Sequence, residues 1–130
     1  MHAEHADQER LKELSGNVIG GAFNVLNTLG TGFLEKVYEN SLALELRERG
    51  FSVKQQHGIT VTYHGAIVGQ YFADLLVNNE LLIEIKVAKV LDDASHLQCI
   101  NYLKGTGLRL CLLLNFARPK LEIKRIANGL

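Results

Sequence analysis

Residues 69–89 read GQYFADLLVNNELLIEIKVAK, and this stretch decides the fold. Two runs rich in aliphatic residues flank residues 78–80, and this pattern predicts two strands joined by a tight turn. Three charged residues, Asp74, Glu84 and Lys86, lie within these strands. Because charges are rarely buried in a sheet without a partner or an ion, we expect a functional site in this hairpin.

The apolar pattern of the hairpin fixes how its strands pair. The odd-numbered positions are apolar on both strands: Tyr71, Ala73, Leu75, Val77, Leu81, Ile83, Ile85 and Val87. Side chains two apart point to the same face, and a slip of one residue would set apolar against polar positions, so odd lies opposite odd. Pairing Val77 with Leu81 leaves a three-residue loop, with an Asn suited to a left-handed backbone. The same register sets Asp74 opposite Glu84, with Lys86 on the same face.

Asp74 and Glu84 would then be two like charges facing each other, which destabilises a sheet. A divalent cation between them would remove that cost, and without a cation the crowding raises at least one carboxylate pKa. Removing one charge at nearly constant shape, as in Asp74→Asn, is therefore expected to stabilise the metal-free protein. The simpler alternative is an exposed strand face on which Asp74 forms an ordinary ion pair with Lys86.

Length and composition indicate one globular domain over residues 1–130. Hydrophobic residues make up 47% of the chain and charged residues 22%, as in ordinary soluble proteins. The formal net charge is zero, which argues against a domain that holds nucleic acid by bulk positive charge. The polar N-terminus is unlike a signal peptide, and no apolar run is long enough to cross a membrane.

The cysteines and histidines carry no metal-site spacing. Cys99 and Cys111 lie in apolar surroundings, so we interpret them as small core residues without a disulfide, in a reducing, cytoplasmic compartment. His57, His64 and His96 are interpreted as turn and surface residues. The basic residues of the second half of the chain are expected to be solvated: Lys104, Arg109, Arg118, Lys120, Lys124 and Arg125.

Hydrophobic periodicity predicts the remaining elements. Helical spacing covers residues 4–29, 33–49 and 93–104. Strand patterns cover residues 51–56, 58–63, 67–77, 81–87, 108–115 and 121–126. The helix between the hairpin and the apolar strand at 108–115 implies a crossover to a parallel or mixed-sheet partner. The fold class is therefore α/β (α+β), with helices packed on a central mixed sheet.

The third predicted helix has two stripes of interest. Leu97, Ile100 and Leu103 recur at spacings of three and are expected to form its core stripe. Gln98 and Tyr102 are four residues apart and share a second stripe. Taken alone, Gln98 and Tyr102 fit a helix surface as well as they fit a site.

Asp74, followed ten residues later by residues 84–86 (Glu-Ile-Lys), resembles the signature of the PD-(D/E)XK nuclease superfamily. Gln98 and Tyr102 resemble the QxxxY helix motif of its RecB-like members. Residues 32–38, GFLEKVY, fit the GxxExxY pattern that names a family of small prokaryotic proteins assigned to this superfamily. The segments LLIEIKVAK, QCINYLKGTG, LLLNFA and IKRI look like that family too, so the resemblance covers nearly the whole chain.

The resemblance implies a restriction-endonuclease-like core that hydrolyses phosphodiester bonds with Mg²⁺ or Mn²⁺. Asp74 and Glu84 would bind the cation, with the backbone carbonyl of Ile85 as a third oxygen ligand. Glu35 stands where the superfamily often places an additional acidic residue, and it would hold a metal-bound water or a second ion. Hard oxygen ligands of this kind suit Mg²⁺.

The resemblance also implies roles for three residues that do not bind the cation. Lys86 would position or help deprotonate the attacking water and steady the charge that develops on the phosphate. Gln98 would orient Lys86 or a phosphate, with Tyr102 beside it.

Two classes of function follow, a metal-dependent nuclease or a non-catalytic nucleic-acid-binding or assembly protein on a nuclease fold. The intact set of Asp74, Glu84 and Lys86 favours the nuclease. DNA is the expected substrate, with RNA as the alternative. Because the chain shows no separate recognition domain, specific cleavage would need a homodimer or a protein partner.

Overall fold

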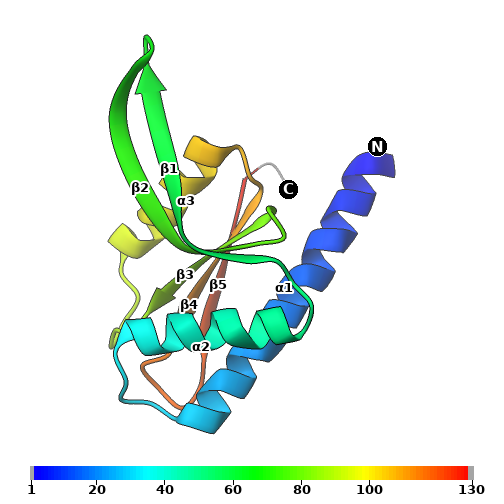
Figure 1. The fold of residues 1–130 in the computed structure, drawn as a ribbon, viewed down its shortest axis with the longest axis vertical. Helices are drawn as coiled ribbons and strands as arrows, with labels where there is room; N and C mark the ends of the chain where they lie inside the picture. The colour runs from blue at the N-terminus through cyan, green and yellow to red at the C-terminus, as the bar shows by residue number, and fades with distance from the viewer. Residues whose placement is uncertain (1, 129–130) are drawn as a thin grey trace.

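Two helices begin the chain, and a five-stranded sheet interrupted by a third helix follows (Figure 1). The computed structural model describes residues 2–128. The elements are α1 (His2–Leu29), α2 (Glu35–Glu48), β1 (Val53–Tyr63), β2 (Ala66–Val77), β3 (Leu81–Lys86), α3 (Asp93–Thr106), β4 (Leu110–Asn115) and β5 (Glu122–Ala127). All predicted helices are confirmed to within a few residues, whereas the separate strands predicted at 51–56 and 58–63 form the single strand β1.

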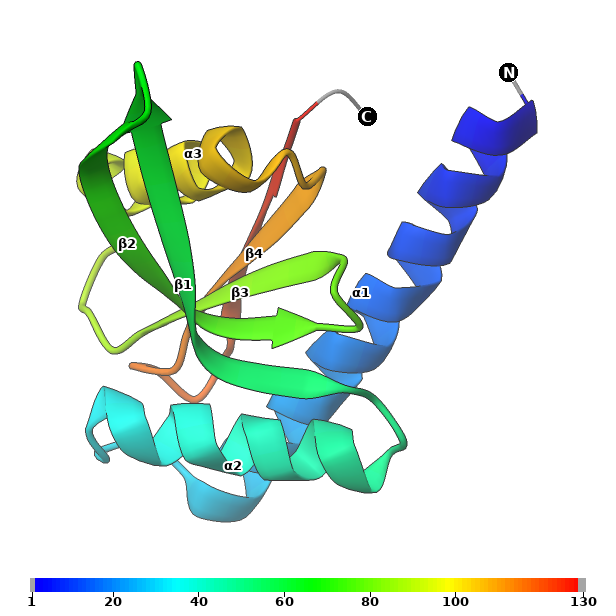
Figure 2. The ribbon, with the colours of Figure 1, turned by 45° about the horizontal axis from the view of Figure 1, so that its top comes forward.

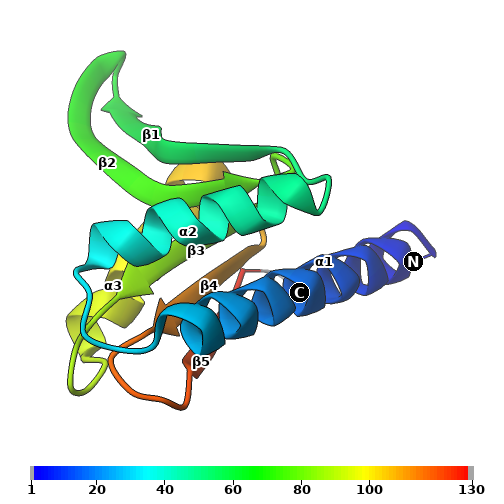
Figure 3. The same cartoon turned by 60° about the horizontal axis from the view of Figure 1, so that its bottom comes forward.

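The sheet is mixed, as predicted. Its strand order is β1-β2-β3-β4-β5, and β3 and β4 run parallel while the other neighbours are antiparallel. Parallel neighbours need a crossover, and α3 provides it. Figure 3 shows α1 and α2 on one side of the sheet and α3 on the other. This arrangement confirms the α+β class with helices flanking a central mixed sheet.

Each face of the sheet has its own apolar core. Leu42 of α2 packs with Leu75 and Leu112 in the core under α1 and α2. Leu103 of α3 packs with Leu82 in the core on the opposite face. β4 is buried along its whole length, because it lies between two strands and is covered on both faces. Its continuous apolar sequence is explained by this position.

The cysteines and histidines largely follow their predictions. Cys99 and Cys111 are buried and free. His64 lies in the turn between β1 and β2, and His96 is exposed on α3, but His57 lies within β1 and not in a turn. In the described part of the chain, no helix has the combination of length and apolar character that crossing a membrane requires.

The hairpin between β2 and β3 has the predicted register. Leu75 pairs with Ile83 and Val77 pairs with Leu81, so the loop consists of residues 78–80. Its two asparagines have φ values of 52° and 56°. Asn tolerates this left-handed conformation better than most residues, which explains its choice here.

The predicted apolar face of β2 is wrong beyond its last residues. Leu75 belongs to the core under α1 and α2, but Ala73 belongs to the core under α3. The backbone bends between them, where Gln56 of β1 has a φ of 53° and falls opposite Asp74. Beyond this bend the β1–β2 ribbon leaves β3 and extends over α3 (Figures 1 and 2). Tyr71 consequently lies on the α3 side, where its ring contacts Tyr102 with centroids 6.0 Å apart.

The core stripe of α3 also differs from the prediction. Leu97 is 57% exposed, and the buried residues of the helix are Cys99, Tyr102 and Leu103. The helix is therefore rotated so that Tyr102, which belongs to the second stripe, faces the sheet. Asp92 caps its first turn by accepting a hydrogen bond from the Ser95 nitrogen.

Candidate functional site

Asp74 and Glu84 lie together at the point where β2 separates from β3. Asp74 Oδ2 accepts a hydrogen bond from the backbone nitrogen of Ile85 at 2.7 Å. Glu84 Oε1 accepts one from the backbone nitrogen of Asp74 at 3.3 Å. Regular pairing of the strands ends at Leu75 and Ile83, so the two carboxylates take the place of further ladder bonds. The predicted neighbourhood of the carboxylates is present, although they are not a regular cross-strand pair.

Glu84 is buried, with only 3% of its surface exposed. Burial, followed by the adjacent Asp74 carboxylate, raises the pKa of Glu84 to about 9. The Tyr102 hydroxyl oxygen lies 3.0 Å from Glu84 Oε2 and 3.1 Å from the Phe72 carbonyl oxygen. One hydroxyl hydrogen cannot serve two acceptors at once, so a proton on Glu84 would satisfy both contacts. The expected rise in a carboxylate pKa is confirmed at Glu84.

Lys86 and Gln98 form the second part of the site. Lys86 Nζ donates a hydrogen bond to Gln98 Oε1 at 3.2 Å, which joins the end of β3 to α3. Both residues line a hollow of about 520 Å³, together with Tyr71 and Asn101 among others. Asp74 and Glu84 do not line this hollow. It lies beside the carboxylate pair, on the side of Lys86.

The structure rejects the simpler alternative for these charges. Glu84 is buried, so the strand face is not exposed. Among the described residues, no ion pair joins Lys86 to Asp74; the polar partner of Lys86 is Gln98. The interpretation as an ordinary surface ion pair is therefore wrong.

Glu35 is the first residue of α2, and its position depends on Tyr38. The Tyr38 hydroxyl donates to the Gly30 carbonyl at 2.7 Å and accepts from the Phe33 nitrogen at 3.3 Å, which ties down the loop before α2. The Tyr38 ring is fully buried and stacks on Phe116, with centroids 4.8 Å apart. In the GFLEKVY segment, Tyr38 therefore anchors the loop that sets the position of Glu35.

The Glu35 side chain is exposed and lies within electrostatic range of the pair. Partial desolvation raises the pKa of Glu35, with Asp74 and Glu39 adding to the rise and Lys86 opposing it. No hydrogen bond joins Glu35 to Asp74 or Glu84 in the part of the chain that is described. Hydrogen bonds thus join Asp74, Glu84 and Tyr102 in one group and Lys86 and Gln98 in another. Glu35 has no hydrogen bond to the acidic pair and lies at its edge.

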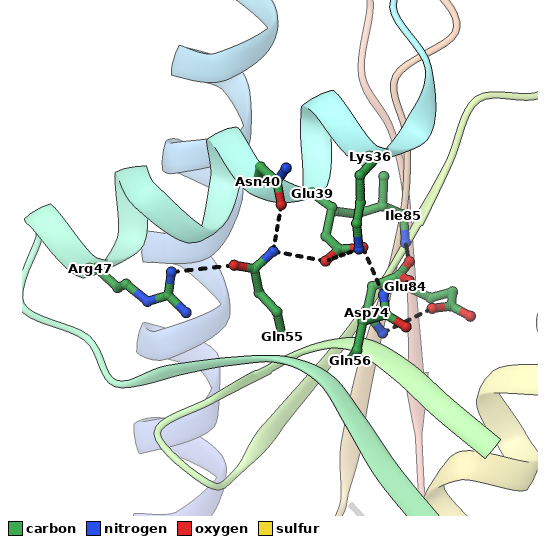
Figure 4. Close-up of polar contacts among 9 residues, drawn as sticks. All are labelled: Lys36, Glu39, Asn40, Arg47, Gln55, Gln56, Asp74, Glu84 and Ile85. Carbon is green, nitrogen blue, oxygen red and sulfur yellow. Dashed lines mark hydrogen bonds and ion pairs between the residues drawn. The ribbon is translucent and has the colours of Figure 1, made fainter. Parts of the chain in front are cut away.

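Sequence reasoning missed a second buried carboxylate, Glu39 of α2, which is 4% exposed. Its oxygens accept hydrogen bonds from Lys36, Gln55 and Gln56 at distances of 2.8–3.2 Å. Gln56 Nε2 also lies 3.2 Å from Asp74 Oδ1, so this network reaches the site (Figure 4). The available signal was that Glu39 interrupts the apolar stripe of α2.

The donor set fits a hard divalent cation in its chemistry. Asp74 and Glu84 offer four carboxylate oxygens, and each accepts one hydrogen bond from Gln56, Ile85, Asp74 or Tyr102. A carboxylate oxygen has a second lone pair, so every one of them retains capacity for a ligand bond. In residues 2–128, no three or more His, Cys, Asp or Glu side chains are clustered closely enough to hold a metal ion. A cation here would depend on the pair, backbone oxygen and water.

Comparison with known proteins identifies the family of the chain. The model of the PD-(D/E)XK nuclease superfamily matches residues 12–126. No curated protein matches the chain significantly.

A solved structure titled "Crystal structure of SSO0001" is similar to this chain, with a TM-score of 0.52 and 17% sequence identity. The similarity covers 73% of this chain and 53% of that one, so this chain spans about half the length of that protein. At this identity the likeness concerns the fold alone. The family match extends over most of the chain. The mixed sheet and flanking helices of the chain agree with the restriction-endonuclease-like core expected of such a family. The chain belongs to the PD-(D/E)XK nuclease superfamily.

Proposed function

We propose that this protein is a nuclease that hydrolyses phosphodiester bonds of DNA with Mg²⁺ or Mn²⁺, and that it belongs to the GxxExxY branch of its superfamily. The observation that carries the proposal is the pair formed by Asp74 and Glu84, whose carboxylates lie side by side where the two strands separate, with Glu84 buried. Lys86 follows on the same face of β3, next to an open hollow. A carboxylic acid whose pKa is raised by burial and by a neighbouring carboxylate, as at Glu84, is common at catalytic sites.

Asp74 and Glu84 would hold the cation through their carboxylate oxygens, with the Ile85 carbonyl as a further ligand and Glu35 holding water at the edge. A bound cation supplies charge neutralisation at the phosphate and a more acidic water. Tyr102 fixes Glu84 from α3 through the contact between its hydroxyl and Oε2. Ile85 fixes Asp74 through its backbone nitrogen. The carboxylates are therefore oriented by the fold before any ligand arrives.

Lys86 is the residue we propose to act on the reacting groups. An ammonium group carries three hydrogens, and Gln98 accepts one of them. The others are free to be donated to a phosphate oxygen or to a water in the hollow that Lys86 lines. Donation to a developing negative charge stabilises a transition state more than a ground state, which is the condition for catalysis. Gln98 sets the direction of the ammonium group.

The test is cleavage of single- and double-stranded DNA and of RNA, by protein prepared free of contaminating nucleases, in Mg²⁺, in Mn²⁺ and in chelator. We expect DNA cleavage that depends on metal. Lys86→Ala should lower it by about 100-fold or more, the scale of one lost electrostatic contact at a transition state. Lys89→Ala is the matched control, because Lys89 is exposed three residues further on and contributes only its backbone carbonyl to a described contact.

Equal activity of wild type and Lys86→Ala would reject catalysis at this site. Preference for RNA over DNA would correct the substrate. A homodimer or a protein partner, which we expect if cleavage is specific, is tested by measuring the molar mass in solution with and without DNA.

One observation favours a second candidate function, a non-catalytic nucleic-acid-binding or assembly protein on the same fold. Each carboxylate oxygen of Asp74 and Glu84 already accepts a hydrogen bond from the protein. A site that needed no cation would have its oxygens satisfied in this way by the protein alone. Calorimetric titration with Mn²⁺ distinguishes the two functions. The nuclease requires a specific binding heat that Asp74→Asn abolishes, and the non-catalytic protein does not.

A further inference from the structure

Gln56 has an unusual place in the fold, at the bend of the β1–β2 ribbon. Its φ of 53° is in the left-handed region, which a residue with a long side chain adopts only at a cost in free energy. Its neighbours Gln55 and His57 pair regularly with Leu75 and Ala73, so Gln56 falls opposite Asp74. A backbone strained at one residue next to a candidate site calls for an explanation in terms of what that side chain does.

The side-chain amide of Gln56 lies between two carboxylates. Its Nε2 atom donates to Glu39 Oε1 at 2.8 Å and lies 3.2 Å from Asp74 Oδ1. An ionised carboxylate only accepts hydrogen bonds, and an amide nitrogen has two hydrogens to give. The two contacts therefore fix which way the amide points. Figure 4 shows Gln56 between Asp74 and the side chain of Glu39.

Glu39 holds this amide in place. It is 4% exposed, and Lys36 Nζ lies 3.1–3.2 Å from both of its oxygens. Gln55 Nε2 donates to Glu39 Oε2 at 2.8 Å. The buried Glu39 side chain is thus paired with Lys36 and hydrogen-bonded, and its Oε1 atom accepts from Gln56. The network runs from α2 through Gln56 to the acidic pair.

We propose that Gln56 is a positioning residue that, anchored by Glu39, fixes the Asp74 carboxylate in its metal-binding orientation. The inference rests on the proposed function, in which Asp74 binds the cation. Ile85 holds Oδ2 of Asp74 and Gln56 holds Oδ1, so neither oxygen is free to rotate away. Without the amide, the carboxylate keeps only one restraint. Metal binding must then order the carboxylate, and the free energy that this costs lowers the affinity for the metal. Groups that orient a ligand in this way typically change metal affinity about 10- to 100-fold when they are removed.

Gln55 provides a matched control within the same network. It is the adjacent residue, it has the same side chain, and it donates to the same carboxylate at the same distance of 2.8 Å. Its second partner is Asn40 at 2.7 Å, whereas the second partner of Gln56 is Asp74. Gln55→Met and Gln56→Met thus each remove one amide from Glu39, and only Gln56→Met removes a contact to the site.

The experiment measures Mn²⁺ affinity by calorimetry and by electron paramagnetic resonance of free Mn²⁺, with the melting temperature in chelator as a measure of folding. We expect Gln56→Met to weaken Mn²⁺ binding by about 10- to 100-fold. Gln55→Met should bind Mn²⁺ with an affinity within about twofold of that of wild type. Its melting temperature in chelator should fall by about as much as that of Gln56→Met. Gln56→Gly is the second variant, because Gly adopts the left-handed backbone without strain and so protects the fold. It should weaken binding as much as Gln56→Met.

Wild-type Mn²⁺ affinity in both Gln56 variants would overturn the inference and leave the proposed function intact. Equal weakening in Gln55→Met and Gln56→Met would also overturn it, because the effect would then belong to Glu39 or to general stability. No Mn²⁺ binding by the wild type would overturn the proposed function itself, and the inference with it.

Discussion

Glu84 is joined to the backbone of Asp74, since Glu84 Oε1 accepts the Asp74 amide hydrogen at 3.3 Å. Asp74 in turn accepts the amide hydrogen of Ile85 at 2.7 Å. Side-chain oxygens thus satisfy two backbone donors that would otherwise be left without partners where the sheet splits. The acidic pair is part of the fold, and any change to it alters stability and the site together.

Glu84→Gln is expected to stabilise the metal-free protein. The amide oxygen can accept from the Asp74 nitrogen, and the amide nitrogen can donate to the Tyr102 oxygen, so the hydrogen bonds survive without a buried ionisable group. We expect a gain of about 1 kcal/mol or more in the free energy of unfolding at pH 8 in chelator. Urea denaturation of both proteins measures it, and a variant less stable than wild type would contradict the argument.

The hydrogen bonds reverse the expectation for the other carboxylate. Asp74 accepts from Ile85 and from Gln56, and an amide at this position offers only one accepting oxygen. Asp74→Asn therefore serves as the control for Glu84→Gln, because it makes the same change from carboxyl to amide but should destabilise the metal-free protein by about 1 kcal/mol.

The stability of the metal-free protein should fall as pH rises between about 4.5 and 9, owing to Glu84. Its pKa of about 9 in the folded protein lies above the ordinary value of 4.5, so in this range the folded state keeps a proton that the unfolded state releases. The stabilisation is complete below the unfolded pKa and is lost as pH approaches the folded one. The slope contributed by this group reaches about 1.4 kcal/mol per pH unit.

Denaturation of wild type and Glu84→Gln at several pH values in chelator isolates this slope, because the other titrating groups are common to both proteins. Glu35, whose pKa is also raised, contributes in the same direction in each. Parallel stability curves for the two proteins would show that Glu84 is ionised at neutral pH.

The sequence predicted most of this fold because its local signals agreed with its tertiary structure. The register of the β2–β3 hairpin followed from the alternation that ends at Val77 and restarts at Leu81, and the structure has that register. The crossover helix and the buried strand β4 followed from length and apolarity alone. Such patterns predict structure reliably where one face of a strand, or one stripe of a helix, packs against the same core along its whole length.

One physical cause of the failures is that alternation assumes a straight strand. The left-handed backbone at Gln56 bends the ribbon. Ala73 therefore packs in the core under α3 and not, like Leu75, in the core under α1 and α2. The sequence carries no Gly there to announce the bend. Glu39 could have been suspected as an acidic residue on an apolar stripe, but its partners Gln55 and Gln56 lie on a strand 16 and 17 residues away. Contacts between elements of this kind are not encoded in local periodicity.

Two helical glycines should respond in opposite ways to alanine. A Cβ at Gly105 of α3 would lie 2.8 Å from Ile59 Cγ2 of the β1–β2 ribbon, whereas a Cβ at Gly16 of α1 would meet nothing within 4 Å. Gly16→Ala should stabilise by about 0.5–1 kcal/mol, the difference in helix propensity. Gly105→Ala should destabilise by about 1–3 kcal/mol, because overpacking exceeds the gain in propensity. Melting temperatures that rise for both would show that the ribbon yields freely above α3.

Binding of a divalent cation at neutral pH should release a proton from Glu84. The pKa of this residue is about 9 without metal, so at pH 7.5 the side chain is protonated, and a carboxylate must lose its proton to become a ligand. Calorimetric titration with Mn²⁺ in buffers of different ionisation enthalpy measures the number of protons released. We expect a value close to one for wild type and a smaller value for any Glu84→Gln binding that persists. A binding heat independent of the buffer would mean that Glu84 is already ionised, or that the cation binds elsewhere, and Asp74→Asn separates these cases because it abolishes binding only in the first.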